Sequence, residues 1–330
     1  MNNRARFNYY SGQVVEVYVP DSIAMAGFRF AGAYKKSGAP SFLSDANGPL
    51  KVSLISNLGV ESTAHANNWY GLFACANAGD ASAKYKLMPF LRIGSIAGSV
   101  ASFTYGGEGP SAHVVTTTSY AWADDSLRGA DCLVINESGR FSARVTTITG
   151  NRTSTVTLAD PGGIGAFDFL LPAPPGFEHY VYLGSFYRDT AEVRNIADTG
   201  AAVGSYGVQV QDPNFPLSGP IAQTIPGSPG IGARINFGGY ISPLATAVTF
   251  ENGEKLNTAS LGLFAINFSH DGSNHVVGRH LLCKESSPVY YRAQTITMPF
   301  SIGQFSYAWT GGNLQADRTG TIQIYGSIEL

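Results

Sequence analysis

The chain has 330 residues, a formal net charge of −2 and only 13% charged residues, where about 25% is usual for soluble domains. Without a basic excess to neutralise phosphates, an electrostatically driven nucleic-acid binder is excluded, and no apolar run approaches the roughly 18 residues that span a bilayer. With 44% hydrophobic and 12% aromatic residues, the chain has ample apolar surface to bury, which argues against a disordered protein.

The scarcity of charge is concentrated in long stretches. Residues 293–316 carry no charge, Asp212 is the only charged residue in 201–233, and Glu108 is the only one in 93–123. One interpretation is an all-β protein rich in Ser, Thr and Asn. The interpretation that we favour is a surface largely covered by other subunits, because isolated soluble domains normally cover themselves with mixed charge. It predicts that 201–233 and 293–316 are buried, in cores or against neighbouring copies.

The N-terminal end predicts a short strand and no signal peptide. Arg4 and Arg6 are not followed by an apolar block, and the first strand-like run, 14–19, is short and carries Glu16.

The rest of the chain predicts strands. The best helix candidate is 63–76, but Gly71 and the β-favouring pair Trp69-Tyr70 favour a strand there. Three further runs alternate between polar and apolar residues and stop at turn residues: 143–149 (ending at Gly150-Asn151), 295–298 and 321–325. Short strands without intervening helices predict an all-β fold of two or three antiparallel β-sandwich or jelly-roll-like modules.

A proline-rich stretch divides the chain. Residues 211–234 contain five prolines, which remove donors from a sheet ladder and predict an extended linker. It separates an N-terminal β region, 1–210, from a C-terminal β-sandwich domain, 235–330.

The N-terminal region contains a faint repeat. Residues 52–54 are followed by 89–96, and 156–158 by 179–186; in each case a short alternating strand precedes an apolar strand that contains Gly-Ser. Either the similarity is chance among β sequences, or it marks two related modules, at about 45–107 and 150–200.

Two arrangements offer chemistry. His270 and His275 flank a turn-rich Asp-Gly-Ser-Asn, and a hairpin there would bring them within reach of one metal ion; a polar loop is the favoured interpretation, so we expect no metal.

Asp124-Asp125 follows Trp122, as a sugar-binding or glycosidase site would need. Adjacent strand residues point to opposite faces, so an Asp-rich turn is favoured, and Glu108 is a loop charge available to a partner. We expect neither catalytic residues nor a cofactor, and therefore no enzyme.

The three cysteines predict no special chemistry. Cys75, Cys132 and Cys283 lie far apart, form no CxxC pair and sit in or beside apolar runs. We expect them to be buried as small hydrophobic side chains.

Four segments resemble bacteriophage tail-fibre and related virion structural proteins. The first three are the Trp-Tyr strand at 67–74, the Pro-Phe-Leu-Arg-Ile-Gly-Ser strand at 89–95 and a second version of the latter half at 171–185. Residues 298–326 are similar to the closing strands of phage jelly-roll-like domains. The resemblance implies an oligomeric virion component, and because the pattern is structural it carries no catalytic residues.

Together these observations predict a non-enzymatic structural subunit of a bacteriophage particle, located in the virion and associated with the tail fibre or baseplate. Two alternatives remain: a capsid decoration or head-fibre protein, and a carbohydrate-binding host-recognition or depolymerase protein that contacts a surface glycan. We expect a homo-oligomer, a trimer, that also contacts other virion proteins. The large aromatics are candidate anchors of core or subunit contact: Trp69, Tyr70, Trp122 and Trp309.

Overall fold

The structure is a computed structural model. It describes residues 5–28, 39–44, 48–60, 63–97, 112–116, 118, 120, 122–135, 143–160, 164, 168–188, 193, 196–198, 208–211, 233–236, 242–256, 262–269, 278–284, 290–299, 304–310 and 318–329. Within these residues the regular elements are all strands, with no helix, and every pair of strands is antiparallel. The predicted all-β, antiparallel class is therefore confirmed, while the sandwich or jelly-roll arrangement stays a prediction.

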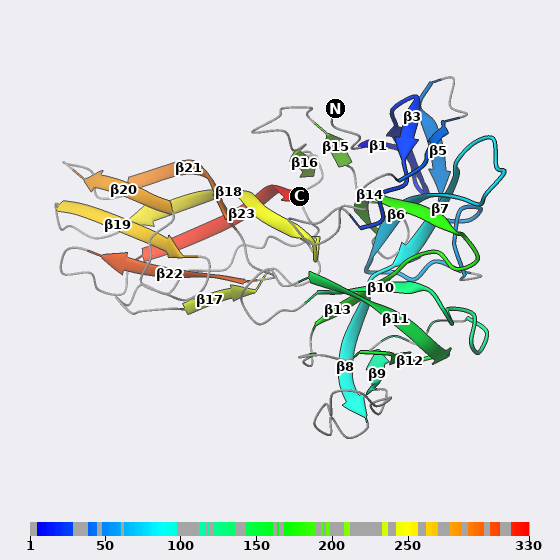
Figure 1. Cartoon of the computed structure of the whole chain (residues 1–330). Coiled ribbons are helices and arrows are strands. Elements are labelled where there is room, and N and C mark those ends of the chain that lie inside the picture. Colours follow the sequence, from blue (N-terminus) through cyan, green and yellow to red (C-terminus); the bar gives the residue numbers. More distant parts are fainter. Residues whose placement is uncertain are drawn as a thin grey trace.

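An eight-stranded sheet joins both ends of the chain (Figure 1). Its N-terminal strands are β1 (Arg6–Ser11), β2 (Val14–Tyr18) and β5 (Leu50–Ser53), which confirms the strand predicted at 14–19. The remaining strands are β15 (Ile196–Asp198), β16 (Val208–Gln211), β18 (Ala245–Leu256), β21 (Tyr290–Pro299) and β23 (Arg318–Glu329). A small hairpin, β3 (Ser22–Ala24) with β4 (Ser41–Leu43), lies beside the N-terminal strands.

A three-stranded sheet has β6 (Asn68–Ala76) at its centre, between β14 (His179–Arg188) and β7 (Lys84–Pro89). This confirms the strand predicted around Trp69-Tyr70. Both faces of β6 are buried: Trp69, Phe73 and Cys75 belong to one hydrophobic cluster, and Tyr70 and Leu72 to another. A strand covered on both faces shows a continuous apolar run instead of alternation, which is why this segment resembles a helix in sequence.

Six strands close into a barrel: β8 (Leu91–Ala97), β9 (Ala112–Thr116), β10 (Asp131–Ile135), β11 (Ala143–Arg152), β12 (Thr155–Leu158) and β13 (Phe169–Pro172). The prediction that the strand at 143–149 stops at Gly150-Asn151 was wrong. A register shift between Ile148 and Gly150 lets β11 continue to Arg152, opposite Thr155 of β12.

The C-terminal part also contains a four-stranded sheet of β17 (Ala233–Asn236), β22 (Gln304–Thr310), β19 (Gly262–Ser269) and β20 (Gly278–Lys284). The strands predicted at 295–298 and 321–325 are confirmed as parts of β21 and β23. Residues 212–232 of the predicted linker lie outside the described residues, as do the side chains of 201–233 and 293–316.

Strands of the two proposed N-terminal modules pair with one another. β6 pairs with β14, and β8 pairs with β13. The two Gly-Ser strands of the faint repeat take different places, since 89–96 contributes to β8 of the barrel and 179–186 to β14 of the three-stranded sheet. The division into modules and domains stays a prediction.

Two of the three cysteines occupy the core as expected. Cys75 and Cys132 are free thiols that are fully buried, and burial raises the pKa of both. Cys283 lies on β20, and its side chain is not among those that the structure describes. Within the described residues, no helix is long and apolar enough to cross a membrane.

Candidate functional site

The candidate anchors lie inside the chain wherever their side chains are described. Trp69, Tyr70 and Trp122 are all buried. These three are therefore core residues, which is one of the two roles that the sequence left open. Trp309 lies on β22 opposite Ile266, with its side chain outside the described residues. His270, His275 and Glu108 lie outside them altogether.

Trp122 is part of an aromatic stack beside β11 of the barrel, and Asn68 at the start of β6 donates to the hydroxyl of Tyr120 in this stack at 3.3 Å. Its ring stacks on Tyr120, with centroids 4.9 Å apart, and its indole Nε1 donates to the carbonyl of Arg152 at 2.8 Å. The ring of His65 meets Tyr120 edge-on at 4.8 Å. Burial lowers the pKa of His65, and the charge of Arg188 lowers it further. Because the Trp122 ring is covered, it presents no stacking surface to a sugar.

Asp124 and Asp125 lie in the turn that follows this stack, which confirms the interpretation as a turn. Asp125 has a φ of 59°, and its exposed carboxylate lies 3.9 Å from Arg128, a surface pair of little energetic weight. The buried Asn151 holds the turn: its Oδ1 accepts from the amide of Leu127 at 2.7 Å, and its Nδ2 donates to the carbonyl of Ala123 at 3.1 Å.

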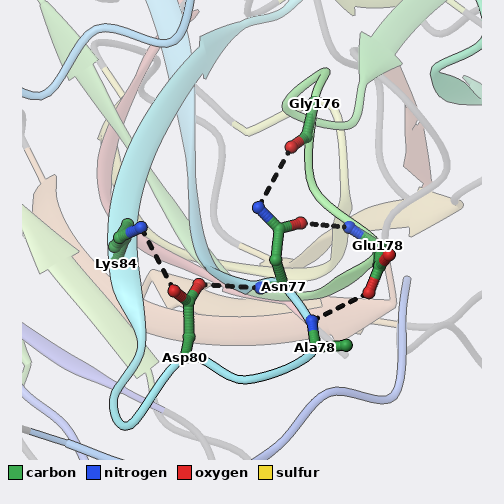
Figure 2. Close-up of polar contacts among 6 residues, drawn as sticks. All are labelled: Asn77, Ala78, Asp80, Lys84, Gly176 and Glu178. Atoms are coloured by element: carbon green, nitrogen blue, oxygen red, sulfur yellow. Dashed lines mark hydrogen bonds and ion pairs between the residues drawn. The ribbon is translucent and has the colours of Figure 1, made fainter.

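A polar corner ties the turn between β6 and β7 to the segment before β14, about a hundred residues further along (Figure 2). The side chain of Asn77 accepts from the amide of Glu178 at 2.9 Å and donates to the carbonyl of Gly176 at 3.4 Å. Glu178 returns the contact, because its Oε2 accepts from the amide of Ala78 at 2.8 Å. These hydrogen bonds run in both directions and hold together two turns that are far apart in the sequence.

Asp80 completes the corner from the β6–β7 side. Its carboxylate accepts from the amide of Asn77 at 2.8 Å and from Lys84 Nζ at 3.4 Å (Figure 2). The hydrogen bond from Asn77 and the charge of Lys84 lower the pKa of Asp80. Because these side-chain oxygens already accept hydrogen bonds from the chain itself, we interpret the polar corner as a contact that stabilises the fold. Across the described part of the chain, no group of three His, Cys, Asp or Glu side chains is placed to hold a metal ion.

The best candidate for an interaction surface is the outer face of β1, β2 and β5. Phe7, Val15 and Val17 point into the core, so the alternate residues point outward. The outward set is Arg6, Tyr10, Glu16, Tyr18 and Lys51, which we call the N-terminal face. The sequence predicts the strand at 14–19 but not this face, because Lys51 reaches it only through the pairing of β5 with β2.

Charged groups contact the two tyrosines of the N-terminal face. Tyr10 is 49% exposed, and its hydroxyl accepts from Lys51 Nζ at 2.6 Å. Tyr18 donates to Glu16 Oε2 at 2.9 Å and lies beneath the guanidinium of Arg6 at 5.3 Å. The hydrogen bond to Glu16 raises the pKa of Tyr18. The face thus combines aromatic area with both signs of charge at the surface.

No model of a known protein family matches this chain, and no curated protein matches it either.

Proposed function

We propose that this chain is a non-enzymatic structural subunit of a bacteriophage particle, associated with the tail fibre or baseplate and assembled as a homotrimer. In this proposal its strands group into two or three antiparallel β-sandwich or jelly-roll-like modules. It works through interfaces with its own copies and with other virion proteins.

The placement of the segments that resemble phage virion proteins carries the proposal. The Trp-Tyr segment is β6, the Arg-Ile-Gly segment is β8, and the 171–185 segment supplies parts of β13 and β14. Their large side chains are mostly buried in the two hydrophobic clusters. A pattern that fills a core is an architectural pattern, which is what the resemblance implies.

The N-terminal face supports the assembly part of the proposal. Tyr and Arg are enriched in protein interfaces. The N-terminal face exposes Tyr10 and, four residues earlier on β1, Arg6, with Glu16 and Lys51 supplying opposite charges. Mixed charge of this kind suits a second copy of the same chain better than a uniformly charged partner.

Particles of a phage that encodes the chain provide the test. Antibodies against the purified chain should label the tail or its fibres in immunogold electron microscopy, and mass spectrometry should find the chain in washed particles. Labelling over the head would favour a decoration protein instead. Absence of the chain from purified particles would contradict a structural role.

A further inference from the structure

A short irregular segment, residues 64–67, leads into β6 along the surface of the molecule. Ala66 and Asn67 in this segment are exposed. The amide of His65 donates to the hydroxyl of Tyr70 at 2.6 Å. Because the segment lies outside the strands, its release breaks fewer hydrogen bonds than the opening of a sheet, and local release of this kind costs less free energy than global unfolding.

The ring of His65 attaches this segment to Tyr120. The imidazole meets the Tyr120 ring edge-on, with centroids 4.8 Å apart, and its Nε2 is buried. The amide of Tyr120 in turn donates to the carbonyl of Thr153, in the turn between β11 and β12 of the barrel, at 2.8 Å. The imidazole therefore lies between a segment at the surface and a tyrosine that the barrel holds.

A positive charge acts on the same imidazole. The charge of Arg188, at the end of β14, lowers the pKa of His65 in addition to the larger effect of burial. Nε and Nη1 of Arg188 are buried, and no acceptor in the described part of the chain lies within hydrogen-bonding distance of them. Tyr70 and Tyr120, the titratable side chains that contact His65 from β6 and from the barrel side, carry no charge in mild acid. Protonated His65 would thus be a second cation in a partly covered site.

We propose that His65 is an acid sensor: when its imidazole takes up a proton, segment 64–67 leaves Tyr120 while the barrel stays folded. In the released segment the imidazolium reaches water and moves away from Arg188, so the released state binds the proton more tightly than the closed state. The released fraction therefore increases as the pH falls below 6.5, by at most about tenfold for each pH unit, and levels off once the closed state is protonated too.

Hydrogen exchange of the full chain, read by mass spectrometry from pH 7.5 to pH 5 and corrected for the intrinsic chemical rate, tests the sensor. The peptide that contains the amide of His65 should exchange faster at low pH, because release breaks the hydrogen bond from this amide to Tyr70. Peptides of β10, in the barrel, should keep their protection. Exchange at His65 that does not depend on pH would overturn the proposal. Equal acceleration in β10 would also overturn it, because the whole chain would then unfold together.

Three variants assign the effect to the imidazole. His65→Gln keeps the backbone amide, removes the titrating group and should abolish the pH dependence of this peptide. Arg188→Gln should reduce the pH dependence without removing it, because burial is the larger cause of the lowered pKa. His179→Gln is the matched control, since His179 lies at the opposite end of β14, with its ring 6.0 Å from that of Phe42, and it should leave the pH dependence unchanged. A pH dependence that persists in folded His65→Gln, or that disappears in His179→Gln, would contradict the proposal.

Discussion

The ring of Phe7 on β1 packs directly on the main chain of Gly184 in β14. A Cβ built on Gly184 would lie 2.5 Å from Phe7 Cε2, and the glycine has a φ of +145° at the point where the pairing of β14 with β6 shifts register. Phe7 also lies 6.4 Å from the ring of Phe186. Strand β1 thus packs on a β-bulge in β14 that requires a glycine at position 184.

Gly184→Ala should therefore destabilise the fold strongly. It combines a strained backbone conformation with a clash against a buried ring, and we expect a loss of about 2–5 kcal/mol in the free energy of unfolding, measured by urea denaturation. Gly48→Ala is the matched control, because Gly48 has a φ of +131° with nothing within 4 Å. Similar losses in the two variants would show that the Phe7 contact is unimportant.

Asn151→Ala should loosen the turn at 124–129. It removes both hydrogen bonds that hold the turn and leaves the buried amide of Leu127 without its acceptor, so we expect about 2–4 kcal/mol of destabilisation in thermal or urea unfolding. Thr149→Ala, at an exposed position of the same strand, should cost within about 0.5 kcal/mol. An Asn151→Ala protein as stable as Thr149→Ala would contradict this description of the turn.

The contribution of the polar corner to the free energy of unfolding should be lost in acid. Because the folded-state pKa of Asp80 is lowered from 3.8, its stabilisation is present above pH 3.8 and is lost as the pH falls through the lower folded-state pKa. Unfolding free energies measured from pH 6 to pH 2 should fall more steeply for the native chain than for Asp80→Asn. Parallel pH profiles would mean that Asp80 has the same pKa in both states.

His65 should titrate below 6.5, in the direction set by its burial and by Arg188. Its neutral form is favoured in the folded state, so the related stabilisation is present above pH 6.5 and declines as the pH falls below it. An NMR titration of the imidazole should give a lowered midpoint, and Arg188→Gln should raise that midpoint only in part, since burial is the larger cause. A midpoint at or above 6.5 in the native chain would contradict the prediction.

Strands and turns were predicted correctly from the sequence where residues close together in the chain determine them. Trp69-Tyr70 and Gly71 favour a strand, and β6 is one; the Asp-rich segment after Trp122 favours a turn, and it is one. The end of β11 was misplaced because Gly150 looks like a terminator, whereas the bulge after Ile148 absorbs it and the strand turns only after Arg152.

Contacts between distant segments were not predictable from the sequence. Asn77 and Asp80 have the composition of an ordinary turn, and nothing local indicates that Asn77 meets Glu178 a hundred residues later. Ser185 and Ser242 likewise look like ordinary polar residues until the turn before β18 packs against β14 and buries them together. Side-chain pairing of this kind depends on the order of strands in the sheets, which composition and periodicity do not determine.

If this chain is a structural subunit that assembles with its own copies, the mass of the native particle in solution reveals it. Native mass spectrometry or multi-angle light scattering of the purified full chain should give three times the chain mass of 34.9 kDa. A fully soluble, stable species with the mass of a single chain, unchanged as the concentration is raised, would contradict it.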